Sequence, residues 1–316
     1  MILVTGGAGF IGSNLIRTLN SVGRSDILVV DDLRDGTKAL NLSNCVIADF
    51  VDIETCLRKL EASQEISESP IEQVYHLGAC SDTTQWDASF LMRVNFTFTK
   101  LLFKYCMERA VGMVYASSAA VYGSAREFRE EAACEKPLNP YGYSKLVFDQ
   151  YFRRQLGGLT APVIGLRYFN VYGPYETHKG RMASVVYHFH HQIKKTGRAQ
   201  LFGASHGCAD GEHRRDFIYV KDVVDVTLWC GTQPLERSGI YNCGTGCARS
   251  FNDVGHTLMA QLGHGAIEYV PFPSDLLLAY QAHTQADLSR FSDLRFPGGF
   301  TSLESGIAEY VNWLDS

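Results

Sequence analysis

The sequence predicts an α/β protein whose first part is a doubly wound parallel sheet and whose second part is a smaller mixed substrate domain. Short apolar runs rich in β-branched residues alternate with longer amphipathic stretches over residues 1–170. Continuous apolar strands separated by helix-length segments are typical of a parallel sheet covered on both faces. The 316 residues suffice for one large or two small domains, and no repeat or Pro/Gly-rich linker divides them. We therefore predict closely packed domains over residues 1–170 and 171–316, with some later segments returning to the sheet.

The expected strands follow in order along the first domain. They are Ile2–Thr5, Ile27–Asp31, Val46–Asp49, Val74–Ala79, Met113–Ser117 and Val163–Phe169. Beyond Val171 the pattern indicates a helical stretch at Met182–Lys195, a short strand at Gln200–Phe202, a loop at Gly203–Glu212 and a strand at Phe217–Val220. A second half as irregular as this one usually caps the first, so we expect it to cover the sheet.

The composition excludes several classes of partner. Acidic residues outnumber basic ones by 34 to 29, which gives a formal net charge of −5. Such a chain has no global attraction to nucleic acid or to an anionic membrane. It opens without a basic leader, and no apolar stretch reaches the ~18 to 20 residues that span a bilayer. The nine cysteines are scattered without a C-x-x-C pair, so we expect reduced thiols, no metal site and a cytoplasmic location.

A glycine turn directly follows the first expected strand. The run Gly6-Gly7-Ala8-Gly9-Phe10-Ile11-Gly12 leads into an amphipathic helix. Glycines let the backbone approach a ligand closely, and the N-terminus of the helix directs free N–H groups at a pyrophosphate. The context predicts a Rossmann dinucleotide site, with Gly6, Gly9, Phe10, Ile11 and Gly12 at the cofactor.

Two further segments are expected beside the same cofactor. Asp31 ends the second strand, where it suits a ribose hydroxyl of NAD and would repel the 2′-phosphate of NADP. Arg34 and Lys38 follow in the same loop, and either could neutralise that phosphate, so these residues leave NAD and NADP open. The run Leu77, Gly78, Ala79, Cys80 and Ser81 follows the fourth strand and is expected to pass the cofactor.

The candidate catalytic residues follow the fifth strand. Ser118 stands at the end of that strand, and Tyr141 and Lys145 lie four residues apart at the start of the next helical stretch, on one helix face. A tyrosine has an unperturbed pKa near ~10, so acid/base work at neutral pH needs a nearby cation that favours the phenolate. Lys145 is expected to be that cation, with Ser118 holding a substrate hydroxyl against Tyr141.

Together, the glycine turn, Ser118 and the Tyr141/Lys145 pair resemble the extended short-chain dehydrogenase/reductases that modify nucleotide sugars. Over almost the whole chain the sequence is similar to the ADP-L-glycero-D-manno-heptose 6-epimerase family. The segments that carry this likeness are Gly6–Asn14, Asp35–Lys38, His76–Ser81, Lys136–Lys145, Arg167–Pro174, His178–Lys179, Met182–Val185, Arg215–Phe217, Pro271–Pro273, Tyr280–Gln281 and Thr284–Asp287.

The resemblance implies a role for particular residues. Tyr141 and Lys179 would be the two acid/base groups, supported by Ser118 and Lys145. The implied cofactor is NADP, with its phosphate held by Lys38, and the likeness adds Asp32, Asn95, Val171, Lys145 and Lys179 to the cofactor site. The implied substrate-binding residues are Ser117, Asn170, Arg181, His188, Phe202, Gly203, Ala204, Ser205, Arg215 and Tyr280. The implied substrate is an ADP-heptose, and the family forms homopentamers, so a homo-oligomer is expected.

Three departures from the family pattern stand out. Ile53 replaces a lysine that often lies near the adenosine, Arg181 replaces a small residue, and the loop Gly203–Glu212 is several residues longer. The loop puts the lip of the substrate pocket in question.

The implied chemistry is inversion of carbon 6 through a transient 6-ketone, with one base for each pose of the sugar. Three rival functions are weighed against it. A dehydratase of the same superfamily typically carries Asp-Glu after the active-site hydroxyl residue, where this chain has Ala119 and Ala120. A UDP-sugar 4-epimerase is the nearer rival, and Lys179 argues against it. A non-catalytic NADP-binding protein usually lacks the tyrosine or the lysine, and both are present here.

Overall fold

The structure is a computed structural model of the chain and describes residues 1–277 and 280–316. Its largest element is a seven-stranded sheet in the order β10-β6-β5-β4-β1-β2-β3, in which all neighbouring strands are parallel. The strands are β1 (Ile2–Thr5), β2 (Ile27–Asp31), β3 (Asp49–Asp52), β4 (Gln73–His76), β5 (Gly112–Ser118), β6 (Val163–Tyr168) and β10 (Gly239–Cys243). This confirms the doubly wound parallel sheet expected from the apolar runs.

Two strands of the large sheet differ from the prediction by three residues at one end or both. β3 begins three residues later than expected, because Val46 is 63% exposed and gives its amide N–H to the side chain of Asn20 at 2.8 Å. β4 ends at His76 rather than at Ala79, since the chain beyond it turns toward β1. There the amide of Gly78 donates to the hydroxyl of Thr5 at 3.1 Å. Leu77, Gly78 and Ala79 therefore lie outside β4, and all three are among the residues expected at the cofactor.

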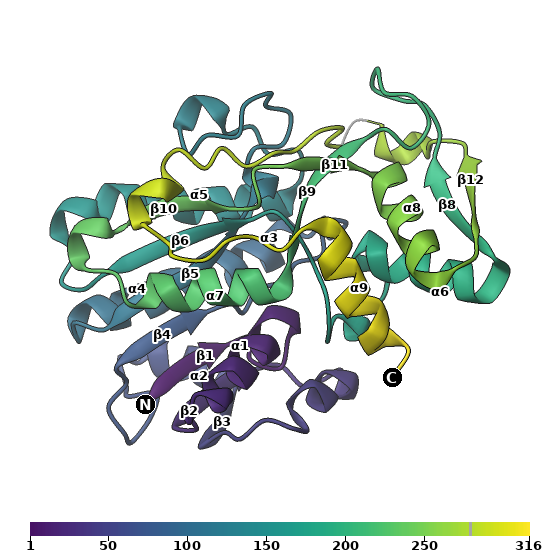
Figure 1. The fold of residues 1–316 in the computed structure, drawn as a ribbon. Helices are drawn as coiled ribbons and strands as arrows, with labels where there is room; N and C mark the ends of the chain where they lie inside the picture. The colour runs from purple at the N-terminus through teal and green to yellow at the C-terminus, as the bar shows by residue number, and fades with distance from the viewer. Residues whose placement is uncertain (278–279) are drawn as a thin grey trace.

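The sheet is buried on both faces, because successive residues of a strand point to opposite sides. The helices that cover it are α1 (Phe10–Ser21), α2 (Ile53–Glu61), α4 (Phe98–Glu108), α5 (Pro140–Gln155) and α7 (Val220–Gly231). Val4 of β1 belongs to the core shared with α1 and α7, whereas its neighbour Leu3 belongs to the core shared with α2, α4 and α5 (Figure 1). Each fully buried aliphatic side chain of this kind contributes about 1.5 to 3 kcal/mol.

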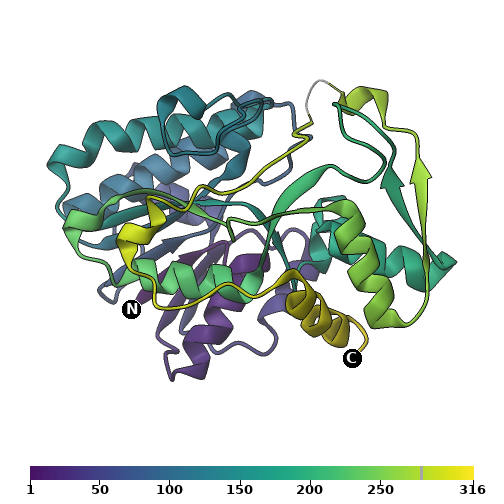
Figure 2. The same ribbon diagram turned by 45° about the horizontal axis from the view of Figure 1, so that its top comes forward.

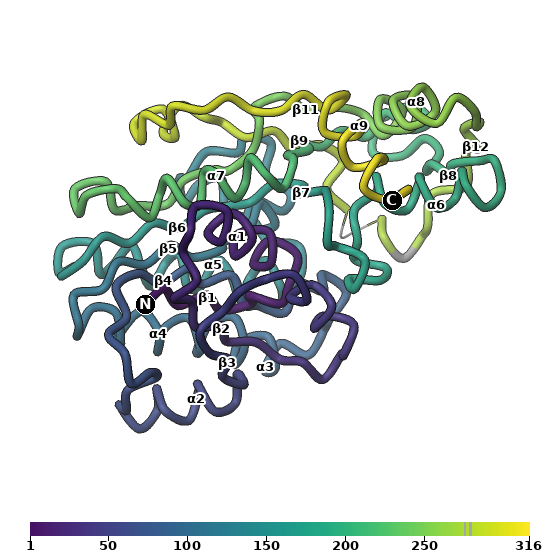
Figure 3. The backbone as a smooth tube through the Cα atoms, turned by 60° about the horizontal axis from the view of Figure 1, so that its bottom comes forward, coloured from purple at the N-terminus to yellow at the C-terminus, as the bar shows by residue number. Residues whose placement is uncertain are grey.

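The strand order reverses at β1. β2 and β3 lie on one side of β1 and β4 to β6 on the other, as the tube of Figure 3 shows. In sheets of this kind a ligand binds in the crevice at the carboxyl ends of the strands, where the order reverses. The segments after β1, β2, β4 and β5 all start at that edge.

The later part of the chain forms two smaller sheets with their own helices. One sheet has the order β11-β9-β7 and the other pairs β12 with β8. The elements are β7 (Asn170–Tyr172), α6 (Val185–Thr196), β8 (Arg198–Phe202), β9 (Arg214–Tyr219), β11 (Ala248–Ser250), α8 (Phe251–Leu262), β12 (Ala266–Val270) and α9 (Leu303–Leu314). In Figure 2, β8, β12, α6 and α8 lie together at one side of the large sheet.

The later segments also contribute to the large sheet. β10 pairs with β6 at its edge, and α7 packs against α1. The division of the chain into domains near residue 170 stays a prediction. Over residues 1–277 and 280–316, no helix has the length and apolar character needed to cross a membrane.

Candidate active site

The turn after β1 is shaped for close approach of a ligand to the backbone. Gly6 has a φ of +68°, and a Cβ at Gly12 would lie 2.1 Å from the Gly6 carbonyl oxygen. Gly9 is the N-cap of α1, and neither a side-chain cap nor an acidic residue occupies the first turn. The helix therefore offers free N–H groups to a phosphate. Together with Phe10 and Ile11, these predicted residues form a cradle that fits the pyrophosphate of a dinucleotide.

A carboxylate and a lysine lie together at the end of β2. Asp31 is 5% exposed, accepts a hydrogen bond from the amide of Ala8 at 2.8 Å and forms an ion pair with Lys38. The ammonium of Lys38 also donates to the carbonyl of Asp32 at 2.9 Å. Arg34, the alternative cation, is 81% exposed and pairs with Asp32 instead. Lys38 therefore offsets the charge that would otherwise repel a 2′-phosphate.

Asn95 ties the loop after β4 to α5. Its buried side chain accepts a hydrogen bond from the amide of Cys80 at 2.9 Å and donates to the carbonyl of Cys80 and the hydroxyl of Ser144, both at 3.0 Å. The same loop is bonded to Thr5 of β1 through Gly78. The structure thus brings together, beside the glycine turn, the predicted residues Leu77, Gly78, Ala79, Cys80, Ser81 and Asn95.

The candidate catalytic tyrosine and serine meet between β5 and α5. Ser118 ends β5, and Tyr141 lies in the first turn of α5. Asn139 caps α5 by accepting a hydrogen bond from the amide of Gly142 at 2.8 Å, and Pro140 opens the helix. The cap fixes the first turn of the helix, and with it the phenol of Tyr141 against the hydroxyl of Ser118.

The electrostatics of this pair differ from the expectation. Burial raises the pKa of Tyr141, and its hydrogen bond with Ser118 lowers that pKa. The lowering that we expected from Lys145 is not found. Its ammonium donates to the carbonyl of Ala116 at 2.8 Å, and burial lowers the pKa of Lys145 to about 8. Burial outweighs the effect of Ser118, so the pKa of Tyr141 lies above its ordinary value.

Lys179 comes from the 3₁₀ segment Thr177–Met182 and lies at the glycine turn. Its Nζ is 5.3 Å from the centre of the Phe10 ring, at the N-terminus of α1. Burial lowers the pKa of Lys179, and nearby Glu176 opposes that shift. The next residue, Gly180, has a φ of +51° and a ψ of −123°, a conformation that favours glycine. The segment thus delivers a partly buried amine to the cofactor edge.

Asn41 holds the Lys179 segment and was missed by sequence reasoning. Its side chain donates to the carbonyls of Ala8 at 3.0 Å and Tyr175 at 3.3 Å, and it bonds the imidazole of His178 at 3.0 Å. It is 5% exposed and links the glycine turn to the residue before Lys179. No local sequence signal marks an asparagine for contacts more than 130 residues away.

Arg181 and His188 meet on the other side of the same segment. The guanidinium of Arg181 is 3.2 Å from the carboxylate of Asp82 and hydrogen-bonds Thr84, in the loop beyond Ser81. The imidazole of His188 lies 3.3 Å from the carbonyl of Arg181. Arg181 therefore joins the Lys179 segment to the loop after β4.

Arg215 marks the other end of the candidate site. It is 7% exposed, donates to the carbonyl of Arg214 at 2.9 Å and lies 4.8 Å from the centre of the Tyr280 ring. In the described part of the chain, no carboxylate pairs with it. A buried guanidinium without an anionic partner suits a phosphate group.

The loop after β8 supplies the wall beside Arg215. Phe202 stacks edge-on against Tyr280, with ring centres 6.4 Å apart. The amide of Gly203 donates to the carbonyl of Val270 at 2.7 Å, and the hydroxyl of Ser205 is bonded to His213 at 2.8 Å. His206 and His213 are further members of this wall that sequence reasoning missed, because no motif marks them: His206 lies in the loop and His213 directly follows it.

Ser117 is a correction to the expected substrate set. It is 3% exposed, and its hydroxyl donates to the carboxylate of Asp149 at 2.9 Å. That carboxylate also pairs with Arg167 at 2.8 Å. Adjacent residues of a strand point to opposite faces, so Ser117 turns toward α5 when Ser118 faces the site. Ser117 therefore serves a buried ion cluster.

Asn170 and Val171 both lie on β7, and no hydrogen bond joins either of them to Tyr141 or Lys179 in the described part of the chain. Asn170 is exposed, and Val171 packs with Ile11 against the cores on either side of α1. Ala204 is held in its loop by an amide hydrogen bond to Asp210 at 2.7 Å. None of these contacts links the three residues directly to Tyr141 or Lys179.

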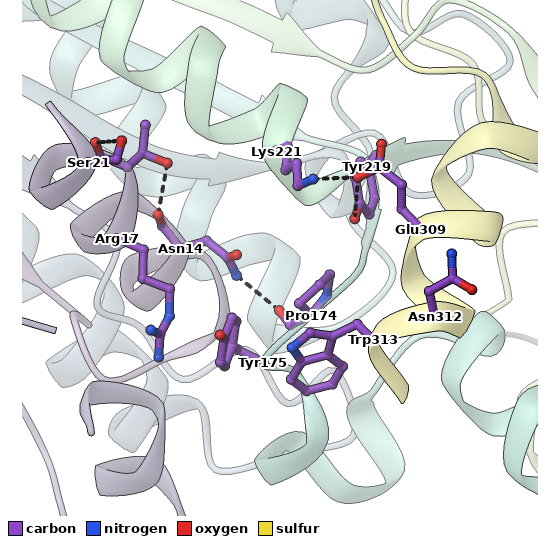
Figure 4. Close-up of a pocket in the computed structure, with 11 residues that line it drawn as sticks. Asn14, Arg17, Ser21, Pro174, Tyr175, Tyr219, Lys221, Glu309, Asn312 and Trp313 are labelled. Atoms are coloured by element: carbon purple, nitrogen blue, oxygen red, sulfur yellow. Dashed lines mark hydrogen bonds and ion pairs between the residues drawn. The ribbon is translucent and has the colours of Figure 1, made fainter. Parts of the chain in front are cut away.

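A cavity of about 550 Å³ lies between α1 and α9 and is also lined by Pro174 and Tyr175 (Figure 4). Several of its polar side chains have partners within the chain. Lys221 pairs with Glu309, Asn14 donates to the carbonyl of Pro174 at 3.0 Å, and Arg17 stacks over Tyr175. Its lining includes none of Ser118, Tyr141 and Lys179.

Comparison with known proteins finds relatives over the whole chain. The NAD dependent epimerase/dehydratase family matches residues 2–244. The ADP-L-glycero-D-manno-heptose-6-epimerase of Alkalilimnicola ehrlichii is 54% identical over 312 residues, which are 99% of this chain and 97% of that protein.

Solved structures share the fold. The crystal structure of the Helicobacter pylori ADP-L-glycero-D-manno-heptose-6-epimerase has a TM-score of 0.82 at 28% identity and is matched over 100% of this chain and 96% of that chain. The Thermotoga maritima UDP-glucose 4-epimerase with UDP-glucose has a TM-score of 0.82 at 26% identity, over 99% and 98% of the two chains. The fold alone does not separate these activities, whereas the 54% identity favours the first.

Proposed function

The chain belongs to the NAD dependent epimerase/dehydratase family, and from this we propose that it inverts carbon 6 of ADP-D-glycero-β-D-manno-heptose to give the L-glycero epimer. The observation that carries the assignment is the 54% identity to a heptose 6-epimerase over 99% of the chain. The nearness of Tyr141 to Ser118, and of Lys179 to the glycine turn, agrees with it. The product supplies heptose for the inner core of lipopolysaccharide.

A nicotinamide cofactor, when bound, supplies the hydride acceptor and donor that make inversion through a 6-ketone possible. The cradle of Gly6, Gly9 and Gly12 would hold its pyrophosphate, with Asp31 at the adenosine ribose. We propose NADP, because Lys38 lies against Asp31 and adds a cation where the 2′-phosphate would sit. The loop after β4, which Asn95 holds through Cys80, would border the nicotinamide half of the cofactor.

Tyr141 and Lys179 carry the proton steps in this proposal. Tyr141 takes the proton from oxygen 6 in one pose of the sugar, and Ser118 orients that hydroxyl. In the reversed pose, Lys179 exchanges the proton with oxygen 6 as its acid/base group. Its lowered pKa makes a neutral amine more accessible. Lys145 anchors the site through the carbonyl of Ala116.

Recognition of the substrate falls to the later part of the chain. Arg215 is buried without a carboxylate partner in the described residues, so we assign it to the diphosphate. Tyr280 and Phe202 are assigned to the nucleoside end. We further propose a homo-oligomer in the cytoplasm, with no nucleic acid or membrane partner.

Two variants test the two-base assignment. Tyr141→Phe and Lys179→Met should each reduce epimerisation by about 10² to 10⁴ while cofactor stays bound, because general acid/base groups contribute that much. Tyr143→Phe, on the exposed side of α5, and Lys195→Met, at the exposed end of α6, are matched controls that should keep full activity. Full activity in Lys179→Met would leave Tyr141 to serve both poses alone.

A further inference from the structure

The loop after β8 is an ordered hairpin. Ser205 and Cys208 exchange two backbone hydrogen bonds, of 3.2 and 2.9 Å. Between them His206 and Gly207 both have positive φ, +54° and +78°, as a type I′ turn requires. The hairpin is closed at its base by the amide of Gly211, which donates to the carbonyl of Phe202 at 2.9 Å. The loop therefore folds back on itself as a hydrogen-bonded projection.

The tip of the hairpin bonds to a segment far along the chain. The Nε2 of His206 is 2.8 Å from the carbonyl oxygen of Leu277. A carbonyl only accepts hydrogen bonds, so Nε2 carries the proton. In a neutral imidazole the other nitrogen is then an acceptor, and the hydroxyl of Ser205, 3.0 Å away, donates to it.

The donor in each hydrogen bond of the series His213–Ser205–His206–Leu277 is thereby fixed. The hydroxyl of Ser205 gives its proton to His206, so its oxygen accepts from the Nε2 of His213 at 2.8 Å. His213 is 1% exposed and directly precedes β9, which carries Arg215. One series of hydrogen bonds, called the relay below, thus runs from His213 before β9 through Ser205 and His206 to the carbonyl of Leu277.

The rings of this relay stand around Arg215. The centre of the His206 ring is 5.3 Å from Phe272 and 5.8 Å from Tyr280, and the last two rings are 5.0 Å apart. The guanidinium of Arg215 lies 4.8 Å from the centre of the Tyr280 ring. Flat rings beside a buried cation without a carboxylate partner in the described residues match a nucleoside diphosphate, whose base stacks and whose phosphates pair with the cation.

We propose that His206 is a positioning residue that fastens the hairpin to Leu277 and so holds the nucleoside diphosphate end of the substrate against Arg215. The inference rests on the proposed function, since it concerns the same substrate site. It assigns the extra length of the loop to binding of the nucleotide, at a distance from the proton chemistry of Tyr141 and Lys179.

The test measures binding of ADP to the holoenzyme by isothermal titration calorimetry. His206→Ala removes two hydrogen bonds of the relay and should weaken ADP binding by about tenfold. It should raise KM for the ADP-heptose more than it lowers kcat. His206→Gln keeps an amide donor for the carbonyl of Leu277 and should recover most of the affinity. His264→Ala, an exposed histidine after α8, is the control and should bind as the wild type does.

The outcomes separate the two claims. Equal ADP affinity in His206→Ala and wild type, or a fall in kcat with KM unchanged, would overturn the role of His206. If His206→Ala does not fold, His206→Gln decides: weak ADP binding in a folded Gln variant contradicts the donor to Leu277. Failure of the wild type to bind ADP would instead count against the proposed function.

Discussion

At the scale of single residues, charge compensation decides what the site holds. Asp31 alone would repel a second phosphate, but it is 5% exposed and shares its charge with the amide of Ala8 and with Lys38. Arg215 is the opposite case, a buried cation that no carboxylate offsets in the described part of the chain. The first arrangement tolerates an anion nearby and the second attracts one.

The first prediction concerns the choice of cofactor. Lys38→Ala should weaken NADP binding more than NAD binding by about 1.5 to 3 kcal/mol, because it removes one charge-assisted contact and leaves Asp31 uncompensated. Titration of cofactor-free enzyme with both nucleotides measures the difference. Arg34→Ala, which removes the exposed cation paired with Asp32, should change neither affinity. An equal loss for NAD and NADP in Lys38→Ala would contradict the phosphate contact.

The second prediction concerns pH. Burial lowers the pKa of Lys145 to about 8, so the ammonium is present below that pH and is lost as the pH rises through it. A charged donor holds the carbonyl of Ala116 more strongly than a neutral amine does, so epimerase kcat/KM should fall on the alkaline side with an apparent pKa near this value. Lys145→Arg keeps its charge at all accessible pH values and should move the fall upward. An alkaline limb at the same pH in both enzymes would assign it to another group.

At the scale of elements, the segment Thr177–Met182 connects the parts of the site. Asn41 fixes its start to the glycine turn, and Arg181 fixes its end to the loop after β4. Gly180 provides the backbone turn between them. The segment thereby sets the position of Lys179 relative to the cofactor cradle, although it has no strand or long helix of its own.

The third prediction tests that connection. The side chain of Arg181 is 70% exposed, so Arg181→Ala should change the unfolding temperature little. It should nevertheless lower kcat by about two- to tenfold, because the Lys179 segment loses its ion pair with the loop after β4. Steady-state kinetics and thermal unfolding of the same preparation check both statements. Arg198→Ala, an exposed residue of β8, is the control, and unchanged kcat in Arg181→Ala would show that the link is dispensable.

At the scale of the whole molecule, the sequence predicted the features that leave a local pattern, such as strands and the glycine turn. It did not predict the contacts between residues that are far apart in the chain. The apolar runs predicted the parallel sheet, because burial on both faces leaves a local pattern, and the glycine turn predicted the dinucleotide site after the first strand. The turn of Ser117 away from the site follows from strand alternation only once the exact end of β5 is known. The contacts of Asn41 with Tyr175 and of His206 with Leu277 join distant segments, and no local pattern encodes them.

The most direct test of the account follows the hydrogen at carbon 6 of the substrate. Purified holoenzyme is incubated in D₂O with ADP-D-glycero-β-D-manno-heptose, and the product is examined by nuclear magnetic resonance. If the hydride leaves carbon 6 and returns to its other face within one active site, the L-glycero epimer forms without solvent deuterium at that carbon and without accumulation of reduced nicotinamide. Deuterium at carbon 6, or no conversion of this sugar by enzyme that converts UDP-glucose, would contradict the account.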